Sequence, residues 1–570
     1  MAIAMGSRGA KDAGPSFVEL FTPKLVTVMR EGYGLAALRA DALAGLTVAI
    51  VALPLSMAIA IASGATPERG LYTAIVGGFI ISALGGSRFQ IGGPAGAFIV
   101  LVAASVARHG IEGLVLATLL AGVLLLAIGL LRLGTFIKFI PYPVTVGFTA
   151  GIAVIIFASQ LKDLLGLKLS GPEPGPFLAK LAALKDALPS VNVAATSLAL
   201  VTIVVIVGLR RLRPGWPGML VAVVLASLLA NLLGLPVETI GTRFGEIPNS
   251  LPLPSLPDIT WAKVEAVLPD AMGFALLGAI ESLLSAVVAD GMTGRRHRSN
   301  CELVAQGVAN IGSALFGGIC VTGTIARTAT NVRAGARGPV SGMLHSLFLL
   351  LFLLIAAPLA RYIPLAALAG VLAVVAWGMI ETHALVALMR TAWGDAIVLL
   401  ATFLLTVLRD LTEGIVVGFA IGLLLFLDRM SQAIEVQGGR ALVADDRADG
   451  AEGKPYDPAE AHATDRDTVV YHISGAFFFG SAATVDAVLD RIGDRHRTLV
   501  LDLEGVPFVD STAATTIAGI ASKARRRAGR VVLVGTTREM RRTLIGHGVR
   551  PPLVRFKASV EAPAVIAGSR

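Results

Sequence analysis

The chain has 570 residues, of which 55% are hydrophobic and 15% are charged. Its mean hydropathy of +0.76 is far above that of a water-soluble protein of this length, so composition excludes a protein that is soluble throughout. The formal net charge of +9 does not indicate a nucleic-acid partner, because much of the positive surplus lies in short loops between apolar runs, where membrane topology explains it.

The chain begins with a mixed, charged segment. Residues 1–41 contain no apolar core in front of a small-residue cleavage site, so we expect a cytoplasmic N-terminal segment and no cleavable signal peptide. Apolar runs then follow one another until Asp428, after which the composition is that of an ordinary soluble domain. The expected parts are a transmembrane transport domain at 42–430, a linker at 431–467 and a cytoplasmic α/β domain at 468–570.

The apolar runs form two series, and a membrane-spanning helix takes about 20 apolar residues. Runs of the first series lie near 43–63, 69–85, 111–131, 139–158, 191–209 and 217–234. Runs of the second series lie near 271–290, 303–317, 339–358, 363–382, 395–411 and 413–430. Each series also contains one helix too short to span, Pro94–Ala107 in the first and Thr324–Arg333 in the second. We therefore expect an all-α membrane domain of fourteen segments, two of them half-helices.

Loop charges test this count, because positive charges gather on the cytoplasmic side of a membrane. With fourteen segments, three basic loops fall on one side, and the acidic, proline-rich loop at 234–270 falls on the other. The basic loops contain Arg210, Arg211 and Arg213, then Arg295, Arg296 and Arg298, then Arg333 and Arg337. We expect a multi-pass protein of the inner (cytoplasmic) membrane with both termini in the cytoplasm.

The two series also resemble one another, which indicates a duplicated unit. The matches are Ile140-Pro141 and Gly147 with Ile363-Pro364 and Gly370, and Gly92-Gly93-Pro94 with Thr322-Gly323-Thr324. Seven segments is an odd number, so the second copy enters the membrane upside down, which is the inverted-repeat plan of secondary transporters. We expect repeats at about 42–234 and 271–430, with the two glycine-rich breaks facing each other across a binding site.

The chemistry of these breaks favours an anion. Each short helix begins near the middle of the membrane, where its first turn offers unpaired N–H groups and the positive end of the helix dipole. Two such ends directed at one site predict anion binding. The expected substrate-binding residues are Gly93, Pro94 and Ala95 in the first copy and Gly323, Thr324, Ile325, Ala326 and Arg327 in the second. Pro94 suits a first helical turn, and Thr324 suits a helix cap.

Two charged residues stand inside the apolar runs. Arg327 lies one turn into the second short helix, where an arginine costs roughly 2.5–3.5 kcal/mol, and we expect it to attract the anion. The alternative is that Arg327 only pairs with Glu281. Glu281 and Ser285 lie one turn apart in an apolar run and predict an ion-coupling site. A buried carboxyl group can carry a proton, whereas Glu281, Ser285, Gly323 and Thr324 together could hold sodium, and the residues leave both open.

Other buried polar residues are weaker signals. His345, Gln306, Asn310 and Asn331 are expected to form hydrogen bonds between helices, whereas Gln90, just before the first half-helix, is as compatible with a ligand role. Cys301 and Cys320 offer neither a disulfide framework nor metal-ligand spacing. No nucleophile-base arrangement or phosphate-binding loop is present, so we expect no enzyme, no cofactor and no firm metal site.

Particular residues carry a resemblance to a known family. They are Ala44-Gly45-Leu46-Thr47-Val48, Pro54, Gly64, Pro67, Gly70-Leu71-Tyr72 and Gly93-Pro94, then Glu281-Ser282, Asn300-Cys301-Glu302-Leu303, and Thr322-Gly323-Thr324 with Arg327. This pattern resembles the sulphate permease family, also called SulP or solute carrier family 26. The resemblance implies a core-and-gate fold, elevator-like alternating access, a substrate between the third and tenth segments, and a homodimer.

The resemblance also bounds the substrate. Members with Leu-Pro-Leu in the first segment, as in Leu53-Pro54-Leu55 here, include carriers of bicarbonate, of C4-dicarboxylates and of sulphate-type anions. The chain departs from many members at Leu55 and at Ala326, which leaves the anion open. Sodium-coupled members have a carboxylate and a hydroxyl at the positions of Glu281 and Ser285, and Glu in place of Asp favours a proton over sodium.

The C-terminal region shows alternating strand and helix patterns, typical of a small α/β domain. The expected elements are strands at 468–474, 476–479, 498–503 and 530–535 and helices at 482–492, 512–527 and 539–546. The run from Val500 to Thr512 resembles the STAS domain of sulphate transporters and anti-sigma-factor antagonists. In the antagonists the serine at the position of Ser511 is phosphorylated, and the alternative is that Ser511 only caps a helix.

These observations together predict secondary active transport of a small anion, coupled to a proton or to sodium. The alternatives are a transport-like membrane sensor, or an anion channel, that signals through the C-terminal domain. The expected partners are the anion, the coupling ion, the lipid bilayer and a second copy of the chain, with no nucleic acid.

Overall fold

The computed structural model describes residues 16–135, 141–171, 173–213, 216–409, 411–433, 435–441, 468–478, 481–482, 485, 497–526 and 528–557. The chain divides into two compact units, Met1–Phe419 and Ala420–Arg570. The first unit is helical, and the second contains a five-stranded sheet. The predicted fold class, an all-α membrane domain with a small α/β domain, is confirmed.

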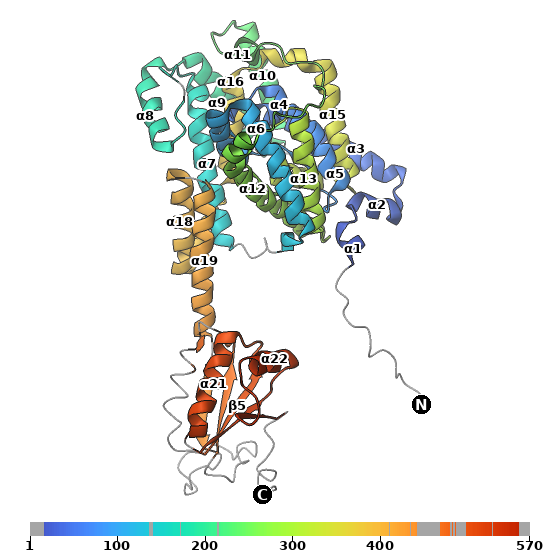
Figure 1. Ribbon diagram of the computed structural model, residues 1–570. Helices are drawn as coiled ribbons and strands as arrows, with labels where there is room; N and C mark the ends of the chain where they lie inside the picture. Colours follow the sequence, from blue (N-terminus) through green and yellow to red (C-terminus); the bar gives the residue numbers. More distant parts are fainter. Residues whose placement is uncertain are drawn as a thin grey trace. The chain divides into compact units, whose positions relative to one another are not determined.

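The first repeat follows two short helices, α1 (Phe17–Phe21) and α2 (Lys24–Gly32). Its elements are α3 (Leu35–Ala62), α4 (Pro67–Tyr72), the π-turn η1 (Thr73–Gly77), α5 (Gly78–Leu84), β1 (Gly92–Gly93), the 3₁₀ turn η2 (Gly96–Phe98), α6 (Ile99–Leu130), α7 (Tyr142–Leu165), α8 (Phe177–Ala187), α9 (Val193–Leu212) and α10 (Gly218–Leu232) (Figure 1). The short α11 (Ile240–Phe244) follows.

The second repeat has the same order. Its elements are α12 (Trp261–Thr293), α13 (Ser299–Leu315), β2 (Thr322–Gly323), α14 (Ile325–Arg333), α15 (Val340–Ala356), the 3₁₀ turn η5 (Ala357–Tyr362), α16 (Leu365–Met379), α17 (Thr382–Thr391), α18 (Trp393–Leu408) and α19 (Leu411–Gln432). Eight helices of the described residues are long and apolar enough to cross a membrane, and α10 and α18 are shorter apolar helices. Large apolar side chains such as Leu228 and Leu351 remain exposed on these helices, as contact with lipid requires.

The first half-helix differs from its prediction. Helical structure begins at Gly96 rather than Pro94. The half-helix and the following span share the label α6, but they are two helices that meet at Gly110, as the sequence predicts. Gly110 kinks this element, because its φ of 66° is incompatible with a helix but open to glycine. With the two parts of α6 counted separately, the described helices agree with the fourteen expected segments.

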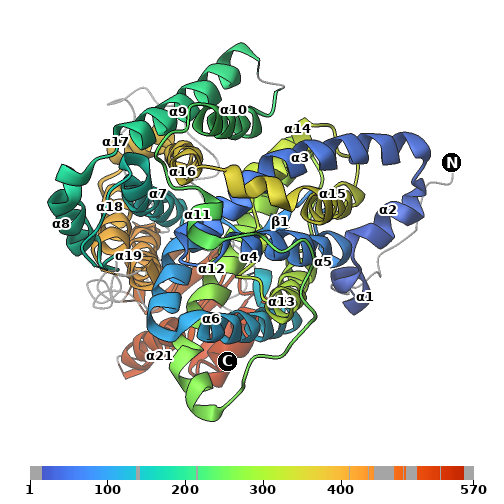
Figure 2. The same ribbon diagram turned by 90° about the horizontal axis from the view of Figure 1, so that it is seen from above.

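The helices form two groups (Figure 2). Helices α3, α4, α5, α6, α12, α13, α14 and α15 pack together, and α7, α9, α10, α16 and α18 form the second group. Each group takes helices from both repeats, as an inverted-repeat fold requires. Small residues permit close packing: a Cβ on Gly122 of α6 or on Gly307 of α13 would lie 2.7 Å from the carbonyl oxygen of the other.

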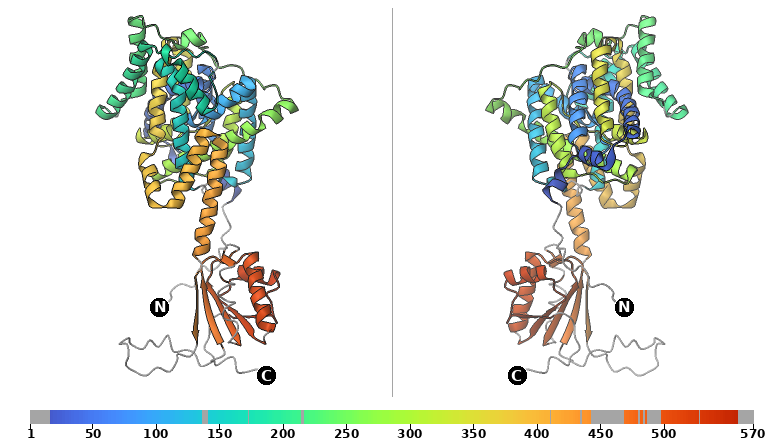
Figure 3. Two further views of the ribbon diagram at one scale, coloured as in Figure 1. Left: turned by 90° about the vertical axis from the view of Figure 1, so that its left-hand side faces the viewer. Right: turned by 90° about the vertical axis from the view of Figure 1, so that its right-hand side faces the viewer.

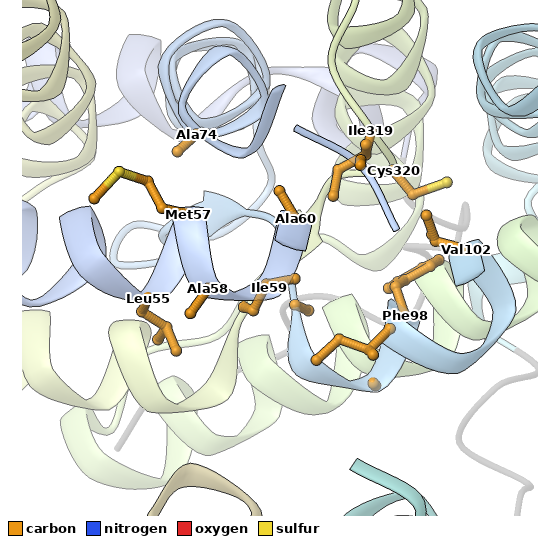
Figure 4. Close-up of a cluster of buried hydrophobic side chains, with 14 of the residues drawn as sticks. Leu55, Met57, Ala58, Ile59, Ala60, Ala74, Phe98, Val102, Ile319 and Cys320 are labelled. Atoms are coloured by element: carbon orange, nitrogen blue, oxygen red, sulfur yellow. The ribbon is translucent and has the colours of Figure 1, made fainter. Parts of the chain in front are cut away.

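The apolar core of the first group surrounds the helix breaks. Figure 4 shows side chains of this core: Leu55, Met57, Ala58, Ile59 and Ala60 of α3, Ala74 of η1, Phe98 and Val102 at the start of α6, and Ile319 and Cys320 just before β2. All of them are buried. The core therefore fixes the chain on both sides of the position where β1 and β2 meet.

The second unit contains β3 (Glu435–Ala441), β4 (Thr468–Ser474), β5 (Thr498–Gly505), β6 (Arg530–Val534) and β7 (Val554–Phe556), in that order across the sheet. Only β3 is antiparallel to its neighbour. Helices α21 (Ser511–Arg526) and α22 (Arg538–Gly546) lie on one face of the sheet (Figure 3). Buried side chains including Leu501, Leu533 and Ile517 join this face to the helices.

Some expectations for this unit need correction. The sequence predicts β4, β5, β6, α21 and α22 within a few residues, but misses β7 and places a linker where β3 pairs with β4. Of the expected strand at 476–479, Phe477 forms a single bridge with Val509. Most of the expected helix at 482–492, and Ile140 of the repeat match, lie outside the described residues.

Candidate anion-binding site

The two glycine-rich breaks meet in the first unit, as the sequence predicts. Strands β1 and β2 pair antiparallel, with Gly92 opposite Gly323 and Gly93 opposite Thr322. Their closeness demands glycine, because a Cβ on Gly323 would lie 1.6 Å from Nε2 of Gln90. The ladder satisfies backbone groups at membrane depth and places the two following helix starts side by side.

The first helix start is apolar. Ala95 is the residue before the first helical position, and Pro94 precedes it, so the expectation that Pro94 lies in the first turn is wrong. Proline disfavours helical backbone in the residue before it, which suits the extended Gly93. The Pro94 carbonyl oxygen accepts a hydrogen bond of 3.2 Å from Nη2 of Arg327.

The second helix start has no side-chain cap. Thr324 occupies the cap position of α14, but its hydroxyl donates to the carbonyl oxygen of Ile91 (3.3 Å) and accepts from no N–H of the helix. The N–H groups of the first turn of α14 therefore have no side-chain acceptor. Ile325 and Ala326 are exposed, so the rest of the protein does not cover this turn.

Arg327 connects three elements. Its side chain is buried, with an exposed fraction of 2%. Nη2 donates to Oγ of Ser56 on α3 (3.1 Å) as well as to Pro94, whereas the buried Nε and Nη1 have no hydrogen-bond partner. A Cβ on Gly93 would lie 2.0 Å from Nη1, so the guanidinium lies directly against β1. The structure thus presents two free donors of a cation between two helix starts.

Glu281 lies on α12, partly exposed, and its buried Oε2 has no hydrogen-bond partner. None of the ion pairs among the described residues joins Glu281 to Arg327, so the direct pair considered as the sole role of Arg327 is not formed in this structure. The carboxylate remains available to a proton or another ion.

Ser285 does not accompany Glu281. Its hydroxyl is buried and donates to Oγ1 of Thr328 (3.0 Å), which also accepts from the N–H of Ile91 (3.1 Å). Of the four residues considered as sodium ligands, Gly323 is in the ladder, Thr324 binds Ile91 and Ser285 binds Thr328. Among their side chains, only that of Glu281 has a buried oxygen that takes part in no hydrogen bond.

The other residues expected to form hydrogen bonds differ in whether the structure gives them partners. Asn310 clamps the segment before β2, because it donates to the Val321 carbonyl oxygen and accepts from the Val321 N–H. Asn331 donates to Phe89 and Ser341. Both ring nitrogens of the buried His345 have no partner in the described residues.

The sequence does not identify Ser56 and Glu302 as residues of the site. Ser56 touches Arg327 from 271 residues away, and no local pattern distinguishes it from other small residues of α3. Glu302 is fully buried and is linked through Ser282 to Gln90. An acidic residue at the start of a helix is explained by its favourable interaction with the helix dipole, so nothing in the sequence indicates that Glu302 is buried.

In the second unit, Ser511 is the first residue of α21, and its side chain is exposed. The N–H of Ala513 donates to Oδ1 of Asp510 (2.8 Å), so Asp510 caps the helix. The alternative that Ser511 is the helix cap is therefore wrong. Among the described residues, no three His, Cys, Asp or Glu side chains gather as a metal site.

Comparison with known proteins agrees with this geometry. The model of the Sulfate permease family matches residues 38–402, and that of the STAS domain matches residues 459–562. The chain is 40% identical to the "Putative sulfate transporter YvdB" of Bacillus subtilis over 508 residues, which are 89% of this chain and 93% of that protein. It is 32% identical to the bicarbonate transporter BicA of Picosynechococcus over 519 residues, 89% of this chain and 90% of the relative.

Solved structures extend the likeness. The transmembrane domain of a cyanobacterium bicarbonate transporter BicA is similar with a TM-score of 0.61 at 34% identity, covering 67% of this chain and 98% of that one. The murine anion transporter Slc26a9 in the inward-facing state has a TM-score of 0.81 at 19% identity, covering 98% and 95%, which shows a shared fold. The family consists of transporters and not enzymes. This chain is a multi-pass membrane protein that belongs to the sulfate permease family and carries a STAS domain.

Proposed function

We propose that the protein is a secondary active transporter of a small anion, bound between the starts of α6 and α14 by Arg327. One observation carries this proposal: the buried guanidinium keeps Nε and Nη1 free at the meeting point of two helix starts. A buried donor without a partner costs about 1–3 kcal/mol, and an anion removes that cost. Each helix start adds the equivalent of about half a positive charge.

The binding residues follow from this arrangement. Gly93 and Gly323 let the backbone approach closely, and Pro94 and Ala95 form the apolar side of the site. Thr324, Ile325 and Ala326 supply the open first turn of α14. The names of the relatives favour sulphate and bicarbonate as the substrate. C4-dicarboxylates remain candidate substrates, because all three anions present oxygen acceptors to a guanidinium.

Coupling is assigned to Glu281, with a proton favoured over sodium. The preference for a proton follows from the resemblance, because the position of Glu281 holds Glu and not Asp. The hydroxyls of Ser285 and Thr324 do not exclude sodium, since a hydroxyl that donates a hydrogen bond keeps lone pairs for a cation. A single carboxyl group with one unpartnered oxygen is enough to carry a proton. The helices form two groups, and the site lies on one of them. Movement of this group past the other would carry the site across the membrane, which is elevator-like alternating access.

The proposal also covers the domain bounds, the membrane location, the oligomeric state and a phosphorylation site. The transport domain spans 42–430, with repeats at about 42–234 and 271–430, and the STAS domain includes β3 (Glu435–Ala441) as well as residues 468–570. Both termini lie in the cytoplasm, the protein resides in the cytoplasmic membrane, and two copies form a homodimer. The exposed hydroxyl of Ser511 at a helix start is a phosphorylation site in this scheme, since the dipole there favours negative charge.

Uptake into proteoliposomes tests the function. Labelled sulphate, bicarbonate and succinate are offered separately under imposed proton or sodium gradients to the parent and to Glu281→Gln. We expect one anion to accumulate in response to the proton gradient, and Glu281→Gln to keep downhill uptake while losing accumulation. Glu265→Gln is the matched control, because Glu265 is an exposed carboxylate of the same helix.

Each other outcome points elsewhere. Uptake that follows only the membrane potential indicates a channel. Absence of uptake for all three anions contradicts the carrier and favours the membrane sensor. Accumulation driven by sodium and lost in Glu281→Gln keeps the carrier but overturns the proton assignment.

A further inference from the structure

Glu302 on α13 is more deeply buried than Glu281, with an exposed fraction of 0%. Among the described residues no Lys, Arg or His lies within 4.0 Å of its carboxylate. Burial of a carboxylate away from water and from a cation is costly unless hydrogen bonds replace the lost hydration. The surroundings of Glu302 must therefore supply donors.

Three donors surround this carboxylate. The N–H of Ser87 donates to Oε2 (3.0 Å), Nε2 of Gln306 donates to Oε1 (3.0 Å), and Oγ of Ser282 donates to Oε1 (3.5 Å). An ionised carboxylate is an acceptor only, and all three contacts match that role. The donors come from the loop before β1, from α13 itself and from α12, so one side chain joins three separate segments.

The loop before β1 fits closely over Glu302. A Cβ on Gly85 would lie 3.0 Å from Oε2 of Glu302, and a Cβ on Gly86 would lie 2.1 Å from the carbonyl oxygen of Arg298. The N–H of Arg298 also donates to the Gly86 carbonyl oxygen (2.9 Å). The loop that leads to the first helix start is thus held against the start of α13.

A second path leads from Glu302 to the other helix start. Ser282, which follows Glu281, accepts a hydrogen bond of 2.7 Å from Nε2 of Gln90. The Gln90 amide lies under Gly323, at 1.6 Å from the position of a Cβ there. Oε1 of Gln90 is buried without a partner. A chain of contacts therefore runs from Glu302 through Ser282 and Gln90 to the backbone just before α14.

We infer that Glu302 is a positioning residue of the anion site. Through Ser282 and Gln90 it fixes the crossing of β1 and β2, so that Arg327 and the two helix starts converge on one point. Glu302 does not touch the anion and does not carry the coupling ion. The inference rests on the proposed function, since the site that it positions is the anion site.

Uptake kinetics provide the first test, with Glu302→Gln, Ser282→Ala and the control Glu265→Gln. We expect the KM for the transported anion to rise about tenfold in Glu302→Gln and less in Ser282→Ala, because a hydrogen-bonded charge is lost in the former and one hydroxyl in the latter. The dependence of uptake on external pH should match the parent. A parental KM in both variants overturns the inference, as does loss of proton-driven accumulation in Glu302→Gln, which would make Glu302 itself the proton carrier.

A stability cycle tests the inference without any transport. Apparent melting temperatures in detergent are compared for the parent, Glu302→Gln, Gln90→Leu and the double variant. We expect the double variant to lose clearly less than the sum of the single losses, because both changes break the same chain of contacts. Strictly additive losses overturn the inference. If Glu302→Gln does not fold, Ser282→Ala takes its place in the cycle.

The two tests separate the two proposals. If the parent takes up no anion, the proposed function fails, and the cycle still decides whether Glu302 is coupled to Gln90. If the parent transports and the cycle is additive, the function stands and the positioning role falls.

Discussion

The two helix starts of the first unit come from equivalent positions of the two repeats, yet their chemistry differs. The start of α6 is apolar, with Ala95, Ala97 and Phe98 buried, and its short helix ends at Gly110, after which a full span begins. The start of α14 is polar and partly open, and the whole helix has nine residues, including the buried Arg327. The first start supplies backbone and an apolar wall, and the second supplies the charge.

This difference shows how a duplicated unit can hold one anion. Symmetry places two helix dipoles at one point, each equivalent to about half a positive charge. A second arginine at the first start would put two buried cations close together, which is strongly unfavourable in a low-dielectric environment. One guanidinium that spans both halves, with contacts to Ser56 and Pro94, provides a charge for the site without that repulsion.

The largest expected effect comes from removing the charge at the second start. In Arg327→Ala we expect uptake to fall by about 100-fold or more, because loss of one partner of a buried charge interaction costs roughly 2–5 kcal/mol. Arg327→Lys should recover a small part, since an ammonium keeps the charge but cannot reach Ser56 and Pro94 while presenting two further donors. Initial rates in proteoliposomes measure both variants. Parental uptake in Arg327→Ala would remove Arg327 from the site.

An intermediate effect is expected at the first helix start, where a substitution fills space and removes no charge. A Cβ in Gly93→Ala would lie 2.0 Å from Nη1 of Arg327 and push the guanidinium away, and such overpacking costs typically 1–3 kcal/mol. We expect the KM for the anion to rise about tenfold. Gly278→Ala is the matched control, since its Cβ would meet Phe98 at an ordinary 3.6 Å. Equal KM values for the two variants would show that β1 does not constrain Arg327.

Much of this fold can be predicted from sequence because lipid imposes long apolar runs, and breaks in them need glycine or proline. The order of the spans, the two short helices and the charged residues at the breaks follow from that pattern alone. The short helices α8 and α17 are missed because neither is long enough to cross a membrane. The break at Gly110 is predicted correctly, because the non-helical backbone of that glycine separates the first short helix from the span that follows.

The site is harder to predict than the fold. Sequence reasoning singles out Arg327 and Glu281 because charges inside apolar runs are rare, but it cannot tell which of their atoms remain free. That depends on partners such as Ser56 and Gln90, which the fold brings in from distant segments. Ser285 illustrates the limit: its spacing from Glu281 suggests a shared ligand, yet its hydroxyl faces Thr328.

The smallest expected effect concerns the threonine at the second start. Because the Thr324 hydroxyl makes only a 3.3 Å bond to Ile91 and does not cap α14, Thr324→Ala should leave the N–H groups of the first turn as they are. We expect KM to change by less than about threefold, in line with the loss of one weak hydrogen bond. Thr330→Ala is the control, since that hydroxyl bonds only to the Ala326 carbonyl of its own helix. A large loss of uptake in Thr324→Ala that sodium restores would instead identify Thr324 as a sodium ligand. The second start would then bind the coupling ion as well as the anion, and the division of chemistry between the two repeats would be sharper still.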